Sequence, residues 1–102
     1  MPLNASEASI EAELKTKGLN APRLTPADID ATIKCEAYYV FSTMTICVLE
    51  LQNGFVVTGE SASASPENFD DAIGRRIARE NARSKIWALE GYLLRERLRG
   101  GR

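Results

Sequence analysis

The sequence predicts an α+β fold in which a three-stranded antiparallel β-meander packs on a long, bent C-terminal helix, preceded by one or two short N-terminal helices. β-branched and aromatic residues are concentrated between residues 36 and 61, which is typical of strands. The pair Asn53-Gly54 separates two apolar runs and is the strongest short-range signal for a β-hairpin. From residue 66 to about residue 99, apolar residues recur at helical spacing, which indicates one long helix.

The N-terminal part of the chain carries weaker signals. A chain of 102 residues is expected to form one domain. We expect a weakly ordered segment over residues 1–24, followed by a single α+β domain over residues 25–102. Within the first segment, Ser6 can cap a short helix that ends at Lys17, with Gly18 as its C-terminal stop. Only two apolar side chains line one face of this helix, so they anchor it weakly.

A second short helix is predicted with clearer boundaries. Thr25 is a favourable N-cap, and Pro26 suits the first helical position. Asp28 places a negative charge near the positive end of the helix dipole. This helix is expected to end near Lys34, just before the strands.

Three strands are expected from the residue types and the turn signals. A turn at Ser42-Thr43 separates the first two, and Asn53-Gly54 separates the second from the third. The expected strands are Glu36–Phe41, Met44–Gln52 and Phe55–Ser61.

The expected hairpin turn determines which side chains share a face of the sheet. A two-residue type I′ turn at Asn53-Gly54 would pair Gln52 with Phe55. Both faces are then largely apolar. We expect the long helix to cover one of them, and the N-terminal helices or a second copy of the chain to cover the other. The first face would carry Cys47, Leu49, Leu51 and Val56, and the second Ile46, Val48, Phe55 and Val57.

The C-terminal helix is expected to begin at Pro66 and to run to about Arg99. Its apolar residues form two stripes about half a turn apart, and one straight helix on one sheet cannot bury both. We therefore expect a bend within residues 81–88 and a contact between the second stripe and another subunit. The first stripe comprises Phe69, Ile73, Ile77 and Trp87, and the residues assigned to the oligomer contact are Ile86, Leu89 and Leu93.

The charges are distributed unevenly along the chain. Residues 75–102 hold nine of the thirteen Lys and Arg and three of the fourteen Asp and Glu, so this segment carries +6. Residues 1–74 carry −7 by the same count. A basic helix of this kind is a surface that meets an acidic partner. We therefore expect a partner with an acidic surface.

Four arginines of the expected helix are the candidate binding residues: Arg75, Arg76, Arg79 and Arg83. One interpretation is a row of guanidinium groups that binds phosphates or the carboxylates of a partner. The other is a solvated helix face whose arginine stems lie over apolar surface, which is the usual meaning of such a series.

The start of the same helix is a candidate anion site. Free N–H groups at a helix N-terminus can bind an anion, and Ser63, Ser65 and Asn68 stand where they could assist. Three carboxylates in and near the first turn already satisfy the dipole there and would repel an anion. Simple capping of the helix is the competing interpretation.

The residue inventory argues against catalysis. The chain has no histidine, so the commonest general base and metal ligand is missing. Cys35 and Cys47 are twelve residues apart, match no metal or redox spacing, and have no histidine to activate them. We expect no enzymatic activity, no catalytic residue, no cofactor and no metal.

Targeting signals are also lacking in the sequence. No stretch approaches the length of a membrane span, and the first residues lack a signal peptide. We expect no membrane association and a location in the cytosol.

A series of short segments between about residue 38 and residue 98 carries a resemblance to a known family. The segments are Cys47-Val48-Leu49, Leu51-Gln52-Asn53-Gly54-Phe55, Thr58-Gly59-Glu60-Ser61, Ala64-Ser65-Pro66-Glu67-Asn68-Phe69-Asp70, Ile73-Gly74-Arg75, Ala78-Arg79-Glu80-Asn81-Ala82, Ile86-Trp87 and Leu89-Glu90-Gly91-Tyr92-Leu93-Leu94. Through them the chain resembles the small tailed-phage proteins named after gene products forty-nine and sixty-six of two enterobacterial phages. Residues 1–35 lie outside the resemblance.

The resemblance implies a phage or prophage origin and expression in a bacterial cytoplasm, and it transfers no catalytic residue to this chain. The leading hypothesis is a non-enzymatic phage accessory protein that binds a host protein stoichiometrically, as an inhibitor in host takeover or against a defence system. The alternative is an oligomer that sequesters a nucleotide or holds nucleic acid through the arginine-rich helix face. A third hypothesis is a purely structural component of an assembly. We also expect a homo-oligomer, because two apolar sheet faces disfavour a bare monomer.

Overall fold

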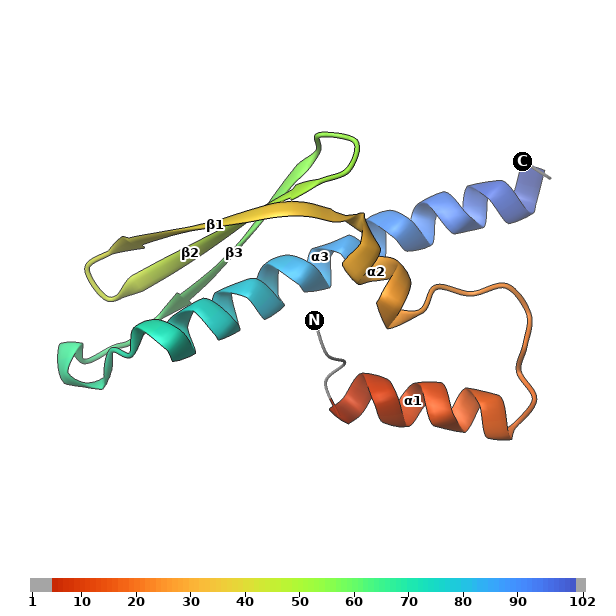
Figure 1. The fold of residues 1–102 in the computed structure, drawn as a ribbon, viewed down its shortest axis with the longest axis horizontal. Coiled ribbons are helices and arrows are strands. Elements are labelled where there is room, and N and C mark those ends of the chain that lie inside the picture. Colours follow the sequence, from red (N-terminus) through yellow and green to blue (C-terminus); the bar gives the residue numbers. More distant parts are fainter. Residues whose placement is uncertain (1–4, 101–102) are drawn as a thin grey trace.

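The computed structural model describes residues 5–100 and confirms the α+β fold (Figure 1). Three strands form one antiparallel sheet in the order β1-β2-β3, with a long helix at the C-terminal end. The elements in chain order are α1 (Ala5–Thr16), α2 (Pro26–Thr32), β1 (Ile33–Phe41), β2 (Met44–Leu51), β3 (Val56–Ala62), the short 3-10 helix η1 (Pro66–Asn68) and α3 (Asp71–Gly100).

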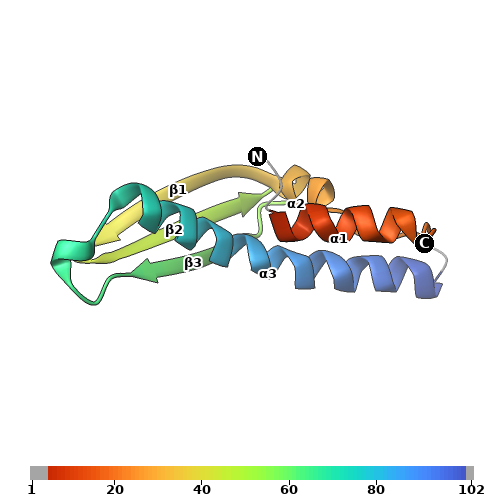
Figure 2. The same cartoon turned by 90° about the horizontal axis from the view of Figure 1, so that it is seen from below.

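The helices all lie on one side of the sheet. α3 runs under the sheet, and α1 lies on the far side of α3 from the strands (Figures 1 and 2). α2 sits at the end of the sheet, where it contacts both α3 and β1. No helix of the described residues therefore covers the second face of the sheet. The sequence predicted that the N-terminal helices or another copy of the chain would cover it.

Most of the predicted boundary signals are present at the two short helices, but Ser6 is not the N-cap of α1, because the helix already includes Ala5. Thr25 accepts a hydrogen bond from the backbone N–H of Asp28 (3.2 Å), and Asp28 accepts one from the N–H of Thr25 (2.9 Å), which forms a capping box. Gly18 has a φ of 67° after the last turn of α1. The N–H of Leu19 donates to the carbonyl oxygen of Leu14 (3.0 Å), which is a Schellman ending.

The β2–β3 hairpin differs from the predicted one by one residue. Its loop has three residues: Leu51 N–H donates to Phe55 O (2.8 Å), and Gly54 N–H donates to Leu51 O (2.9 Å). Gly54 has a φ of 91°, whereas Asn53 does not have a positive φ, so the turn is not type I′. The arrangement matches a type I turn followed by a left-handed glycine. The predicted pairing of Gln52 with Phe55 is therefore wrong.

The shifted register exchanges the two faces of β3. Leu49 pairs with Val57 and Cys47 pairs with Gly59, so Val57 joins the core. Val56, which was predicted to share a face with Cys47, Leu49 and Leu51, is exposed. A shift of one residue has this effect because side chains alternate between the faces of a strand.

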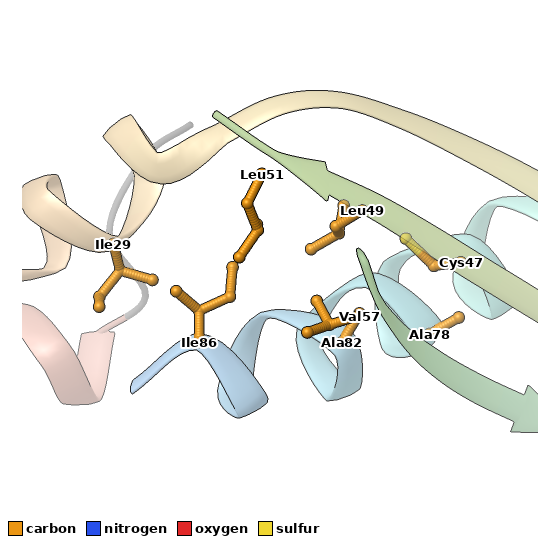
Figure 3. Packing of buried hydrophobic residues seen from close by; sticks show 8 residues of the cluster. All are labelled: Ile29, Cys47, Leu49, Leu51, Val57, Ala78, Ala82 and Ile86. Atoms are coloured by element: carbon orange, nitrogen blue, oxygen red, sulfur yellow. The ribbon is translucent and has the colours of Figure 1, made fainter. Parts of the chain in front are cut away.

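The side of α3 that meets the sheet is made of small residues. Gly74, Ala78 and Ala82 are four residues apart and are all buried. A Cβ at Gly59 of β3 would overlap backbone atoms of Ala78 and Ala82, so the strand and helix backbones are in direct contact there. Figure 3 shows the core that forms around this contact: Ile29, Cys47, Leu49, Leu51, Val57, Ala78, Ala82 and Ile86.

Two predictions about the long helix need correction. The first apolar stripe is not the buried side, because Ile73 and Ile77 are 47% and 44% exposed. The helix begins at Asp71 after the separate turn η1, with the carboxylate of Asp70 accepting a hydrogen bond from the N–H of Ile73 (2.9 Å). α3 then continues as one helix to Gly100 without a sharp kink and extends past the end of the sheet (Figure 1).

The backbone contact at Gly59 leads to a stability prediction. Gly59→Ala should lower the free energy of unfolding by about 3 kcal/mol or more, because the new methyl group has no room and β3 must move away from α3. Chemical denaturation measures this change. The matched control is Gly91→Ala in α3, where the nearest atom to the new Cβ is 4.0 Å away and removal of a helical glycine should add about 0.5–1 kcal/mol. Equal midpoints for Gly59→Ala and the unmodified protein would contradict the close contact.

Candidate functional site

The four candidate arginines do not form one row of available guanidinium groups. Arg83 is buried, with a side chain only 6% exposed, and it forms ion pairs with two carboxylates. Its Nη1 lies 2.5 Å from Glu7 of α1, and its Nε lies 2.8 Å from Asp30 of α2. Arg83 fits neither of the two interpretations of the arginine series, because it is not solvated and is not available to a phosphate.

The environment of Arg83 keeps its charge in place. Burial by itself would lower the pKa of the guanidinium, but the hydrogen bonds with Glu7 and Asp30 outweigh burial and raise the pKa above its ordinary value. A further donor on Arg83 reaches the carbonyl oxygen of Pro26 (3.4 Å). Arg83 therefore joins α1, α2 and α3 at one point.

The other arginines of the series have different surroundings. Arg79 lies 2.6 Å from Glu36 on β1, which joins the helix to the edge of the sheet. Arg75 is exposed, pairs with Asp71 one turn earlier (3.1 Å), and lies over the ring of Tyr38 at 5.0 Å. Arg76 is also exposed. Only Arg75 and Arg76 therefore remain at the surface from the predicted set.

Arg76 lies beside the two exposed isoleucines of α3. Ile73 and Ile77 are four residues apart, and both are directed away from the small residues that meet the sheet. These three side chains form a surface of mixed apolar and basic character on a helix whose other side is fixed in the core. We call Ile73, Arg76 and Ile77 the outer surface of α3.

The predicted anion site is not assembled at the start of α3. Ser63 donates to the carbonyl oxygen of Asn68 (3.5 Å), and Ser65 makes no side-chain capping bond at η1. Ser63 and Ser65 both precede η1, whereas the long helix starts only at Asp71. There the carboxylate of Asp70 already occupies the capping position. Simple capping is therefore the interpretation that fits, although by Asp70 rather than by Ser65.

The predicted oligomer contact divides into two parts. Ile86 is fully buried in the core of its own chain and offers no surface to another subunit. Leu89 and Leu93 are exposed on the part of α3 that extends past the sheet. They line a groove of about 330 Å³ together with Leu51 and Phe55 at the end of the β2–β3 hairpin.

The second face of the sheet is apolar and open. We call it the open face. Its most exposed side chains are Phe41 and Tyr39 on β1, at 81% and 61%. The strand pairing places the following residues on it: Cys35, Ala37, Tyr39, Phe41, Met44, Ile46, Val48, Glu50, Val56, Thr58, Glu60 and Ala62.

The titratable side chains offer little for catalysis. The thiol of Cys35 donates to Glu50 (3.2 Å), and this hydrogen bond raises its pKa; burial raises the pKa of Cys47. A raised pKa lowers the thiolate fraction that would act as a nucleophile. Within residues 5–100, no three Cys, Asp or Glu side chains converge as metal ligands would. None of the helices in that range is long and apolar enough to cross a membrane.

The triad at Arg83 predicts a specific loss of stability. Arg83→Met should lower the free energy of unfolding by about 3 kcal/mol, because Glu7 and Asp30 lose their shared partner in a mostly buried position. Hydrogen exchange should become faster in α1 before the sheet is affected. Arg76→Met, an exposed change on the same helix, is the control and should alter stability by no more than about 0.5 kcal/mol. Unchanged exchange in α1 would show that Arg83 does not hold it.

Tyr38 predicts a dependence on alkaline pH. Burial, followed by the neighbouring Cys47 and Glu36, raises the pKa of Tyr38 to about 12. The folded state therefore holds the phenol proton more tightly than the unfolded state, whose pKa is about 10. The stability from this group is complete below about pH 10 and is lost as the pH rises towards about 12. In denaturant titrations Tyr38→Phe should flatten that decline, and Tyr39→Phe on the open face should not; an equal decline in both variants would refute the assignment.

The model of the Phage protein (N4 Gp49/phage Sf6 gene 66) family matches residues 24–98 of the chain. The match confirms the resemblance seen in the sequence but begins earlier than residue 38, so residues 24–35, which were expected to lie outside, are part of the shared region. No curated protein and no solved structure matches the chain. Since the family match includes α2, the whole sheet and nearly all of α3, the chain belongs to the Phage protein (N4 Gp49/phage Sf6 gene 66) family.

Proposed function

We propose that this phage protein is an accessory protein that acts without catalysis, by stoichiometric binding of a host protein with an acidic surface. The outer surface of α3 makes the contact. The observation that carries the proposal is the pair of half-exposed isoleucines beside Arg76, on a helix whose opposite side is immobilised against the sheet. The place of action is the bacterial host cytoplasm.

The chemistry of this surface suits protein recognition. Two apolar side chains four residues apart on one helix face are the anchors that grooves in partner proteins accept. Arginine is enriched among the residues that contribute most to protein–protein affinity. Arg76 stands beside the anchors and attracts an acidic partner at long range. Because the helix is already folded and fixed, binding requires little further ordering of the backbone.

The nucleotide-binding alternative has less support from the geometry. Arg79 and Arg83 are engaged by carboxylates of the same chain. Arg75 and Arg76 alone would have to hold the phosphates, and at the start of α3 the carboxylate of Asp70 already accepts a hydrogen bond from the backbone N–H of Ile73.

The test uses a tagged protein, nuclease-treated host lysate and three matched forms of the chain. The unmodified protein should retain one host protein in stoichiometric amount. Ile77→Asp should weaken its affinity about 30-fold, the effect of removing one interface residue worth about 2 kcal/mol. Ile10→Asp, the same change at an exposed isoleucine of α1, should bind as the unmodified protein does.

Thermal unfolding of all three forms must show that they are equally folded. Retention of the host protein by Ile77→Asp, or loss by both variants alike, would refute the assignment of the outer surface. Absence of any stoichiometric host protein would refute the proposed function itself.

A further inference from the structure

Two apolar surfaces of the chain remain uncovered, and they lie on different elements. One is the open face of the sheet. The other is formed by the exposed side chains Leu89, Tyr92 and Leu93 on the part of α3 that extends past the sheet. We call these three residues the end stripe. By helical geometry the end stripe lies on the same side of α3 as Gly74, Ala78 and Ala82, which is the side that meets a sheet in the first half of the helix.

We propose that two copies of the chain form a two-fold symmetric dimer, in which the end stripe of each α3 packs on the open face of the other copy's sheet. The inference concerns surfaces other than the outer surface of α3, and it stands independently of the proposed host partner. In this dimer the two outer surfaces remain free and point away from each other.

The dimensions of the elements permit this arrangement. The 30 residues of α3 span about 45 Å, whereas strands of eight residues span about 26 Å. By this difference in length, about 12 residues of the helix continue beyond the hairpin end of the sheet. Figure 1 shows the helix extending past the strands. A second sheet placed end to end with the first would lie over these residues.

Symmetry gives the second sheet the required orientation. A two-fold axis that passes between the sheets, perpendicular to α3, turns the second sheet over. Its open face is then directed at the end stripe of the first copy, and the first open face meets the second end stripe. Both sheets form a middle layer between two antiparallel long helices, so the apolar surfaces left open in one copy are covered in the dimer. Interfaces of this isologous kind are the commonest in homo-oligomers.

Charge favours this pairing over the two simpler ones. The open face carries Glu50 and Glu60 and no basic residue among those the strand pairing places on it, a charge of −2. Residues 95–99 at the end of α3 contain three arginines and one glutamate, a charge of +2. Packing open face on open face would bring four carboxylates together, and packing end on end would bring the arginines together. Only the reciprocal contact places opposite charges side by side.

The small area of one sheet face also favours the reciprocal contact. Three strands about 4.8 Å apart and about 26 Å long present roughly 370 Å² in projection. A stable interface buries about 800 Å² on each partner, so a contact through the sheets alone is small by comparison. The reciprocal dimer adds the end stripe to the buried surface of each copy.

The experiment measures the mass of the full-length protein in solution by sedimentation or light scattering. The unmodified protein should be a dimer. Val56→Lys places a positive charge on the open face, opposite the basic end of the other helix. Leu93→Glu places a negative charge on the end stripe, opposite Glu50. Each variant alone should be monomeric, because the affinity of dimerisation is weakened about 30-fold at each of two symmetric contacts and about 1,000-fold in all.

Mixing the two variants is the decisive step. In the mixed dimer one contact is fully unmodified, and the other pairs the new lysine with the new glutamate, so dimers should re-form. Ile77→Asp, on the outer surface of α3, is the control and should remain dimeric. A monomeric unmodified protein, a variant that dimerises alone, or a mixture that stays monomeric would each overturn the reciprocal contact; loss of host binding with dimers intact would overturn only the proposed function.

Discussion

The fold depends on the direct contact between the backbones of β3 and α3. Gly59 lies against the helix at Ala78 and Ala82, where any larger residue would force the layers apart. Close approach requires small residues on both sides, and this is why the first buried positions of α3 are Gly74, Ala78 and Ala82, with the bulky Ile86 buried only further along the helix. The bulky side chains Ile73 and Ile77 are left outside as a consequence. The same contact holds α3 along the sheet, and the C-terminal part of α3 extends beyond the strands (Figure 1).

Charge helps to hold both N-terminal helices against α3, and α2 also places Ile29 in the core. Arg83 is buried between Glu7 and Asp30, and such a triad is costly to disrupt once formed, because charged groups would lose their ion pairs in a poorly solvated place. It also changes the meaning of the charge pattern. The chain is polarised along its sequence, but Arg79 and Arg83 meet carboxylates from residues 7–36 in space. The basic surface that a partner encounters is therefore smaller than the sequence suggests.

A chain of 102 residues can present several distinct surfaces. The two sides of α3 serve different purposes in the arrangement described here: the small residues hold the sheet, and the isoleucines and Arg76 face solvent. The open face and the end stripe differ from the outer surface in being apolar with opposite charges at their margins. The proposed dimer covers the open face and the end stripe and leaves the outer surface of each copy exposed, so the proposed self-association and the proposed binding of a host protein would not compete for the same residues.

The sequence by itself determined the elements, their order and the family, because these depend on local signals: the capping residues at Thr25, the left-handed Gly18, and β-branched runs separated by turns. Tertiary structure decided what local signals leave open. Asn53-Gly54 is compatible with two loop lengths, and packing of Gly59 on α3 selects the register that puts Val57 rather than Val56 in the core. The partners of Arg83 are 53 and 76 residues away in the chain, and spacing along one helix cannot reveal contacts across such distances. Burial and pairing are properties of neighbours in space, and only the assembled layers define those neighbours.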